Sequence, residues 1–143
     1  AAKCPGLDGR KMSKSYGNGI YLRDTIEEVA PKVRGMFTDP ARLRKSDPGN
    51  PDVCNLFPYH VLMTDAEKQA EIREGCTSAK LGCVDCKKMF LESLARFFEP
   101  LHERRRVLDA DPERVRAILE DGNARARREA AATMDGVRSR IHF

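Results

Sequence analysis

The chain contains no tryptophan, and aromatic residues make up only 6% of its 143 residues. β-Branched residues are also sparse, whereas Ala, Leu, Glu, Arg and Lys dominate, so the composition favours helices over sheets. No segment approaches the roughly 18 consecutive apolar residues of a membrane-spanning helix. An apolar signal-peptide core is missing as well, and we therefore expect a cytoplasmic protein without a membrane partner.

Neither charge sign strongly dominates, because the formal net charge is +4. The arginines are concentrated in the second half, which is compatible with nucleic-acid binding and equally with solvated helix faces. An initial methionine is also lacking, since the chain opens with AAKC and lies inside a motif by residue 10. We therefore expect the chain to be a piece of a larger protein.

The first third of the chain predicts a loop followed by short helices. Residues 1–19 have the Gly, Pro and Ser content of a loop, and a strand or turn is expected at Ile20–Leu22. Asp24 is expected to cap a helical turn over Thr25–Ala30, and Pro31 to open a further helix over Lys32–Met36. A proline-rich connection then separates two structural regions.

The remaining sequence has helical periodicity and predicts a helical bundle. Cys54–Met63 is expected to be a short helix, and Thr64 with Glu67 forms a capping box for a helix that ends near Gly75. One long amphipathic helix starts at Cys83 and should be kinked at Pro100. The run Asp111-Pro112-Glu113 has the residue types of a helix start.

The opening loop carries the residue types that bind a polyphosphate. Its sequence is GLDGRKMSKSYGN, residues 6–18, with Lys11 and Lys14 three residues apart and Arg10 beside them. A lysine is a mobile point charge that can stabilise negative charge as it develops on phosphate. Ser13 and Ser15 can donate hydrogen bonds to phosphate oxygens. A solvated basic loop is the alternative for a generic string of this kind.

Four of the five cysteines have the spacing of a metal site. Cys54, Cys76, Cys83 and Cys86 follow the pattern C-x21-C-x6-C-x2-C. The last two begin the long predicted helix, where the helix dipole and nearby lysines favour thiolates. Zinc and a [4Fe–4S] cluster both accept four thiolates, and four packed reduced cysteines are the alternative without metal.

The run Lys11-Met12-Ser13-Lys14-Ser15 resembles the signature loop of the class I aminoacyl-tRNA synthetases. The stretches that narrow this resemblance to the bacterial-type tryptophanyl-tRNA synthetases are MFTDPARLRKSDPGNPDVC, GCTSAKLGCVDCKK, EPLHERRR and ARREAAATMDGVR. It implies an enzyme that activates tryptophan with ATP and Mg²⁺ and transfers it to tRNA. It also implies that Lys11 and Lys14 are catalytic, that Ser13 and Ser15 support them at the ATP, and that Met12 anchors the loop.

The resemblance also implies a domain organisation. Residues 1–36 would be the end of the nucleotide-binding α/β catalytic domain, 37–52 a Pro-rich connection, and 53–143 the helical tRNA-binding domain with the four cysteines. Some tryptophanyl enzymes carry a [4Fe–4S] cluster on similar cysteines, which favours the cluster over zinc. The full-length protein would be a homodimer.

One departure from the family pattern limits what this chain does alone. The second nucleotide-binding signature, of the H-x-G-H type, is missing. We therefore expect the chain by itself to activate no amino acid. Two alternatives remain open: a standalone metal-binding helical module that binds RNA or protein, and another class I synthetase such as the methionyl enzyme. The arginines at 104–106 and 125–128 are expected either to form salt bridges or to contact tRNA phosphates.

Overall fold

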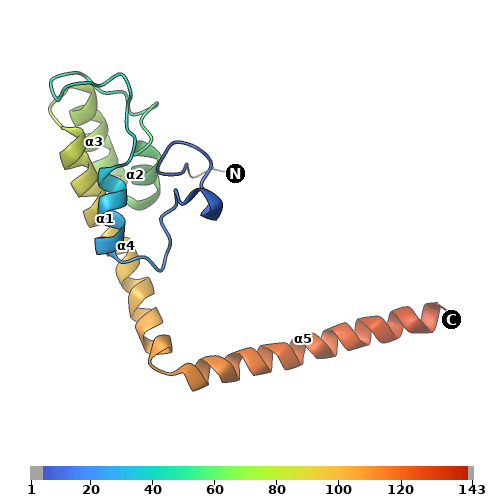
Figure 1. Cartoon of the computed structure of the whole chain (residues 1–143). Helices are drawn as coiled ribbons and strands as arrows, with labels where there is room; N and C mark the ends of the chain where they lie inside the picture. Colours follow the sequence, from blue (N-terminus) through green and yellow to red (C-terminus); the bar gives the residue numbers. More distant parts are fainter. Residues whose placement is uncertain (1–4, 142–143) are drawn as a thin grey trace. The chain divides into compact units, whose positions relative to one another are not determined.

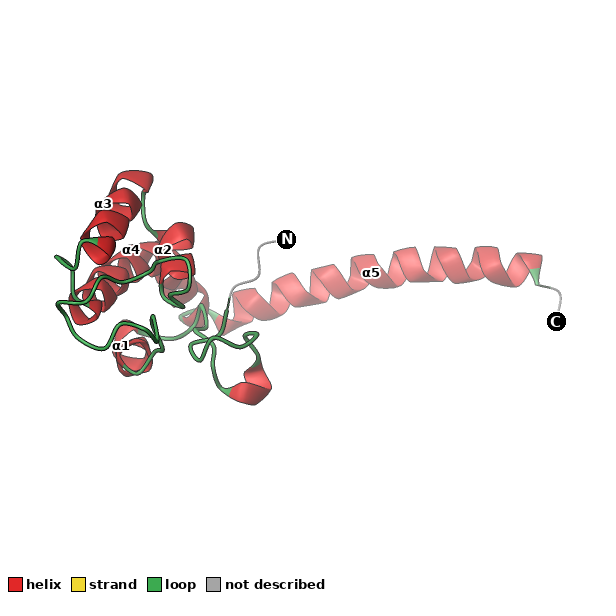
Figure 2. Cartoon of the chain, turned by 90° about the horizontal axis from the view of Figure 1, so that it is seen from above, coloured by secondary structure: helices red, strands yellow, loops and turns green. Residues whose placement is uncertain are grey.

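The structure is a computed structural model that describes residues 5–141. Within that range it consists of helices and loops, without a β-strand, as Figure 2 shows. An isolated bridge pairs Pro5 with Lys11, and where a strand or turn was expected at Ile20–Leu22 the structure has a turn at Leu22 and Arg23. Within the described residues, none of the helices combines the length and the apolarity that crossing a bilayer requires. The predicted mainly helical fold is confirmed.

The chain divides into two compact units, Ala1–Leu101 and His102–Phe143. The elements, in chain order, are a 3₁₀ turn (η1, Lys14–Tyr16), α1 (Ile26–Arg34), α2 (Phe57–Met63), α3 (Ala66–Thr77), α4 (Cys83–Asp109) and α5 (Pro112–Arg140). In the first unit, α1, α2, α3 and the beginning of α4 gather together (Figure 1). The boundary between the units lies between Leu101 and His102, one residue beyond Pro100, which lies inside α4.

The core of the first unit joins three helices and the loops between them. Its fully or nearly fully buried side chains are Val29, Val33, Met36, Leu56, Tyr59, Phe90, Leu94 and Phe98. The rings of Tyr59 and His60 each meet Phe90 edge to face, with ring centroids 5.6 Å apart. Such contacts add to the free energy that burial of the rings already contributes. This core supports both regions in which the sequence predicted chemistry.

Two helices were expected around Pro31, and the structure has one, α1. Thr25, not Asp24, is the N-cap, and it forms a capping box with Glu28. Proline inside a helix costs about 3 kcal/mol. Val29 and Val33 are completely buried on one face of α1, and burial stabilises by about 1.5–3 kcal/mol for each such side chain. The free energy gained by burying these two valines therefore offsets the cost of the backbone hydrogen bond that Pro31 cannot make.

The predicted capping box at the start of α3 is also wrong in detail. The side chain of Asp65, one residue later than expected, accepts a hydrogen bond of 2.8 Å from the backbone N–H of Lys68. The hydroxyl of Thr64 contacts His60 Nδ1 instead, at 3.1 Å. Either residue type suits a cap, but the hydroxyl of Thr64 is occupied by His60, four residues earlier in the chain. The start of α5 follows the prediction, because Asp111 accepts from the N–H of Arg114.

Candidate functional site

The opening loop closes on itself through the buried side chain of Asn18. Its Oδ1 accepts from the N–H of Ser13 at 2.8 Å, and its Nδ2 donates to Asp8 Oδ1 at 2.8 Å and to the carbonyl of Lys11 at 3.2 Å. The hydrogen bond from Asn18 holds the pKa of Asp8 below its usual value. A side chain at Gly6 would collide with Asn18, since a Cβ there would lie 2.2 Å from Nδ2.

The loop is attached to the helical core at several points. Leu7, Met12 and Ile20 pack against the buried cluster. Side chains of the core region also donate to the loop backbone: Asn55 Nδ2 to the carbonyl of Gly6 at 2.8 Å, and the Tyr59 hydroxyl to the carbonyl of Pro5. The loop is therefore a folded part of the first unit.

The two lysines of the loop are exposed. Lys14 opens η1, which Ser13 caps by accepting from the N–H of Ser15, and which Gly17 ends with a positive φ of 62°. Among the residues that the structure describes, neither Lys11 nor Lys14 makes an ion pair. Both ammonium groups are therefore available to a ligand, and the backbone between them is held by capping contacts.

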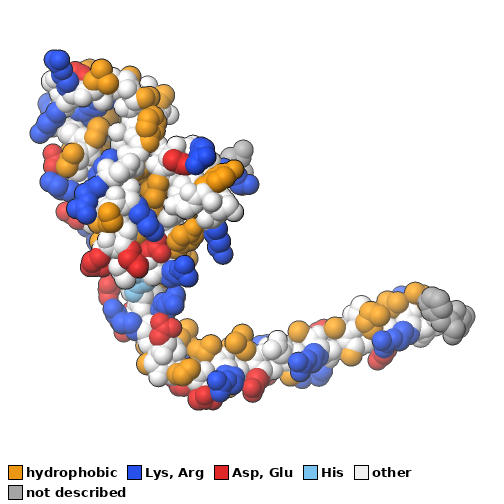
Figure 3. Space-filling model, viewed as in Figure 1, with side chains coloured by type: hydrophobic (Ala, Val, Ile, Leu, Met, Phe, Trp, Pro, Cys, Tyr) orange, Lys and Arg blue, Asp and Glu red, His pale blue; other side chains and the backbone are white. Residues whose placement is uncertain are grey.

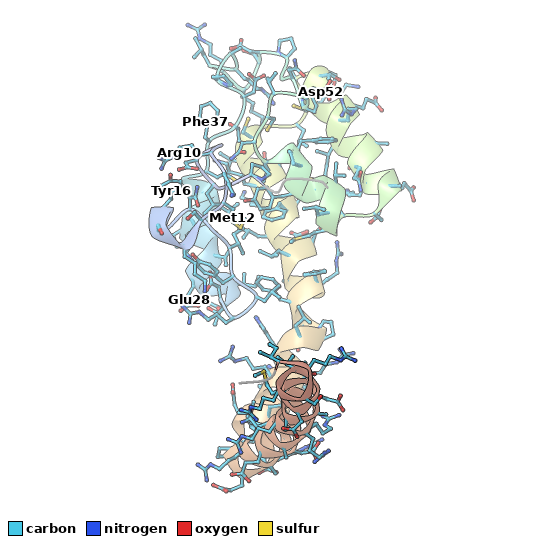
Figure 4. All side chains as sticks on the ribbon, turned by 90° about the vertical axis from the view of Figure 1, so that its right-hand side faces the viewer. Arg10, Met12, Tyr16, Glu28, Phe37 and Asp52 are labelled. Atoms are coloured by element: carbon cyan, nitrogen blue, oxygen red, sulfur yellow. The ribbon has the colours of Figure 1, made fainter. Side chains whose placement is uncertain are left out.

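The third cation of the loop is already used within the protein. Arg10 forms an ion pair of 2.7 Å with Asp8, and its guanidinium lies 4.6 Å from the ring centre of Tyr16. Figure 4 shows Arg10 and Tyr16 side by side at the edge of the loop, with Met12 farther in toward the helices. Arg10 thus stiffens the loop, whereas the sequence suggested that it adds a third free charge.

The four spaced cysteines come from four places in the first unit. Cys54 precedes α2, Cys76 lies in the last turn of α3, Cys83 begins α4 and Cys86 lies one turn later. All four are half-buried and reduced. The fifth, Cys4, lies outside the described residues. The fold thus brings together residues that are up to 32 positions apart in the sequence.

Burial raises the pKa of Cys54 and Cys76, and it raises that of Cys86 to about 12. In each case the neighbouring cysteines add to the effect, because thiolates close together repel one another. Among the described residues, no group of three or more His, Cys, Asp and Glu side chains is arranged so that it could hold a metal ion. In this arrangement Cys54, Cys76 and Cys86 are half-buried thiols that stay protonated near pH 7.

Two side chains that the sequence analysis missed contact these sulfurs. Arg42 Nη1 lies 3.8 Å from Cys76 Sγ and 3.9 Å from Cys83 Sγ. His60 Nε2 lies 3.4 Å from Cys86 Sγ. Burial lowers the pKa of His60 to about 4, so its ring is neutral near pH 7. No sequence signal links either residue to the cysteines, because Arg42 lies in the connection and His60 has the apolar neighbours of a core helix.

Of the three lysines expected near the cysteines, Lys80, Lys87 and Lys88, the last two have other partners. Lys87 Nζ donates to the carbonyls of Arg34 and Met36, both at 2.8 Å, at the end of α1. Lys88 forms an ion pair of 3.2 Å with Asp85. The cation in contact with sulfur is therefore Arg42, which comes from the Pro-rich connection rather than from α4.

The arginines at the end of α4 and along α5 are exposed, and several pair within their own helix. Arg105 pairs with Asp109 at 3.1 Å, Arg106 with Glu103, and Arg125 with Asp121 at 3.2 Å. In the described chain, Arg127 and Arg128 have no ion pair. No described residue of α5 is buried, and Figure 3 shows hydrophobic side chains alternating with charged ones along this helix.

Comparison with known proteins gives one consistent result. The family model of the class I tRNA synthetases (W and Y) matches residues 3–99. The chain is 45% identical over 142 residues to the tryptophan–tRNA ligase of Aquifex aeolicus, a match that covers 99% of this chain and 36% of that protein. It is 47% identical over 142 residues to the tryptophan–tRNA ligase of Thermotoga maritima, covering 99% of this chain and 43% of that protein.

Among solved structures, the tryptophanyl-tRNA synthetase of Campylobacter jejuni in complex with ADP and tryptophan superposes with a TM-score of 0.87 and 27% identity. That match covers all of this chain and 44% of the other. The chain thus spans less than half the length of these relatives. Because the family model covers more than half of the chain, and because the relatives match along almost all of it, the chain belongs to the class I tRNA synthetases of the tryptophan and tyrosine type.

Proposed function

We propose that this chain is part of a tryptophan–tRNA ligase of the cytoplasm, which activates tryptophan with ATP and Mg²⁺ and transfers it to tRNA. The observation that carries the proposal is the opening loop. Two exposed lysines, which form no ion pair with any residue that the structure describes, project from a backbone that Asn18, Ser13 and Gly17 hold in place. The names of the relatives supply the substrate, tryptophan.

Each residue of the loop has a defined task in this proposal. Lys11 and Lys14 bind the phosphates of ATP, and they act most strongly where negative charge develops on the departing pyrophosphate. Ser13 and Ser15 orient the turn and offer hydroxyl donors. Met12 packs against the core and keeps the loop attached while the lysine stems adapt.

Pyrophosphate exchange by the full-length protein tests this function. Exchange that depends on tryptophan supports it, exchange with methionine favours another class I synthetase, and exchange with no amino acid favours a binding module. Lys14→Ala should slow adenylate formation about 10²–10³-fold with little change in tryptophan binding. Lys68→Ala, on the exposed side of α3, is the control and should have no effect. An unchanged rate in Lys14→Ala would contradict the role of Lys14.

We further propose that Cys54, Cys76, Cys83 and Cys86 hold one metal centre, a [4Fe–4S] cluster in preference to zinc. Support comes from the donor set, four half-buried cysteines gathered in one region with a permanent cation in contact with two of them. Because the sulfurs lack the spacing of a ligand set, loading requires them to converge. A bound centre would then tie α2, α3 and α4 to one another.

Metal analysis of protein purified without oxygen tests this proposal. We expect about four irons per chain for the cluster, or one zinc for the alternative. Cys83→Ser should abolish binding, whereas Cys4→Ser, outside the spaced set, should leave it intact. Full alkylation of all four thiols in folded protein that holds no metal would contradict the proposal.

The proposed partner of the exposed arginines is tRNA. Arg127 and Arg128 have no acidic partner in the described chain, and an exposed guanidinium binds phosphate well. We also propose that the full-length protein is a homodimer, and sedimentation would reveal its mass.

A further inference from the structure

We propose that Asn55 and Tyr59, which lie outside the opening loop, are positioning residues for its two lysines. They bind the entry of the loop, the backbone of Pro5 and Gly6, and thereby fix where the ammonium groups stand relative to ATP. This inference rests on the proposed function, which assigns the lysines to the phosphates of ATP. Both residues act through the backbone, since the loop atoms that they contact are carbonyl oxygens.

The two donors reach the loop from a distant part of the sequence. Asn55 lies just before α2, and Tyr59 lies within it. Asn55 Nδ2 donates to the carbonyl of Gly6 at 2.8 Å, across 49 positions of the sequence. The hydroxyl of Tyr59 donates to the carbonyl of Pro5, across 54 positions. Two successive carbonyls at the entry of the loop are thus bound from the region of α2.

The bound carbonyls belong to a tight turn that includes the first lysine. The carbonyl of Gly6 also accepts from the N–H of Gly9 at 3.0 Å, and the N–H of Gly6 donates to the carbonyl of Arg10 at 2.6 Å. Pro5 pairs with Lys11 in the isolated bridge. A shift of Pro5 and Gly6 therefore displaces the backbone of Lys11 as well.

Asn18 extends this connection to the second lysine. Its side chain joins the carbonyl of Lys11, at 3.2 Å, to the N–H of Ser13, at 2.8 Å. Ser13 is the N-cap of η1, which Lys14 begins. The N–H of Leu7 also donates to the carbonyl of Asn18 at 2.8 Å. The loop is therefore one hydrogen-bonded unit, and the two donors near α2 fix the position of its entry.

Both donors are themselves held in place by burial. Asn55 is 8% exposed, and Tyr59 is 1% exposed with its ring edge to face against Phe90. Gly6 is buried too, and a buried carbonyl that loses its donor costs free energy, so the entry stays bound. A misplacement of about 1 Å can slow a reaction about 10²-fold, because charge stabilisation depends on where the lysine stands. Loss of a donor should therefore affect the rate of activation more than the binding of tryptophan.

The experiment measures adenylate formation by the full-length protein in Tyr59→Phe and Asn55→Ala. Tyr59→Phe retains the ring against Phe90 and removes only the hydroxyl. Each variant should lower the rate constant about 10-fold and leave the KM for tryptophan unchanged. Ile72→Val is the control, because Ile72 is buried on α3 and the cluster against which the loop packs is made of other residues. It should lower the thermal stability without lowering the rate constant.

A second measurement separates positioning from a general loss of structure. The same Tyr59→Phe substitution is introduced into a variant that carries both Lys11→Ala and Lys14→Ala. There it should have almost no further effect on the rate constant, because no ammonium group remains to be positioned.

The outcomes separate this inference from the proposal on which it rests. Wild-type rate constants in both Tyr59→Phe and Asn55→Ala would overturn the positioning role and leave the proposed function standing. An equal loss in Ile72→Val, or an undiminished loss in the absence of both lysines, would also overturn it, because the effect would then come from structure in general. If removal of the lysines themselves left the rate constant unchanged, their proposed role would fail and this inference with it.

Discussion

At the scale of single residues, the opening loop depends on one amide. Asn18 is 5% exposed, and its side chain makes three hydrogen bonds, to the N–H of Ser13, the carboxylate of Asp8 and the carbonyl of Lys11. An amide supplies both the acceptor and the two donors that these partners need. The sequence showed a lysine-rich motif ending in Gly17-Asn18, and only the folded loop shows why the asparagine is there.

Asn18→Ala should loosen the segment that carries the two lysines. The N–H of Ser13 loses its acceptor, at a cost of about 1–3 kcal/mol, so local opening becomes easier. Hydrogen exchange in the full-length protein should speed up roughly 10-fold in the peptide that contains Ser13. Asn123→Ala, at an exposed position of α5, is the control and should leave that peptide unchanged. Equal exchange in both variants would contradict the role of Asn18.

Asp24 gives the turn before α1 a dependence on pH. Burial alone would raise the pKa of this carboxyl, but the hydrogen bonds from Lys32 and from the N–H of Tyr21, with the charges of Lys32 and Arg23, lower it below 3.8 in total. The ion pair with Lys32 measures 2.8 Å. Because the folded state binds the Asp24 proton less tightly than the unfolded state, the stabilisation is present above pH 4. It is lost as the pH falls through the folded-state pKa.

A double-mutant cycle with Asp24→Asn and Lys32→Met should detect this pair. The coupling in the free energy of unfolding should be about 0.5–1 kcal/mol at pH 7 and should decrease as the pH falls below 4. The pair Lys68 and Glu71, exposed on α3, provides the comparison and should couple more weakly. A coupling that stays unchanged down to the lowest pH at which the protein remains folded would show that the carboxylate is not its source.

At the scale of elements, α5 is a long helix defined by its own sequence. Asp111 and Pro112 start it, and no described residue within it is buried. Intrahelical pairs such as Arg116 with Glu113, at 2.7 Å, each contribute at most about 1 kcal/mol. Helix propensity and these intrahelical pairs therefore stabilise a helix of 29 residues in which no described side chain is buried.

The unpaired arginines of α5 should carry more of the proposed tRNA affinity than the paired ones. The double variant Arg127→Gln, Arg128→Gln should weaken tRNA binding by the full-length protein. The slope of the logarithm of the binding constant against the logarithm of the salt concentration should decrease by the amount expected for the loss of up to about two phosphate contacts. Arg116→Gln, whose guanidinium already pairs with Glu113, should have a smaller effect. Filter binding at several salt concentrations measures both quantities. Equal losses in the two variants would contradict a specific phosphate contact.

At the scale of the whole molecule, both candidate sites rest on the core of the first unit. Phe90 is fully buried on α4 and contacts Tyr59 and His60 on α2. Tyr59 donates to the opening loop, and His60 contacts Cys86. One aromatic cluster therefore links the lysine loop to the cysteines. A substitution in this cluster should disturb the structure of both.

Phe90→Ala should destabilise the first unit by about 3–5 kcal/mol, because a large cavity opens in its core. The loss of stability is measured by thermal unfolding of the full-length protein, with limited proteolysis as the readout for unfolding of this region. Phe97→Ala is the matched control, since Phe97 on the same helix is 43% exposed and should cost much less. If Phe97→Ala destabilised the protein as much as Phe90→Ala, the position of the core would be wrong.

The sequence by itself determined the helical class, the start of α5 at Asp111 and the presence of a lysine-rich loop near the start of the chain. These features depend on composition and on contacts between residues near in the chain, which are visible as local patterns. The family resemblance rested on such a local pattern as well, and the comparisons confirm it. The roles of the loop residues and of the four cysteines remain predictions.

Only the tertiary structure decided which residues surround the candidate sites. Pro31 stays inside α1 because the burial of Val29 and Val33, on either side of it in the sequence, stabilises the helix. Arg10 forms an ion pair with Asp8 and stacks on the ring of Tyr16. Arg42 reaches two cysteines that are 34 and 41 residues away. Contacts at such separation leave no periodic trace in the sequence, because they depend on how the connection folds back over the helices and not on any local preference.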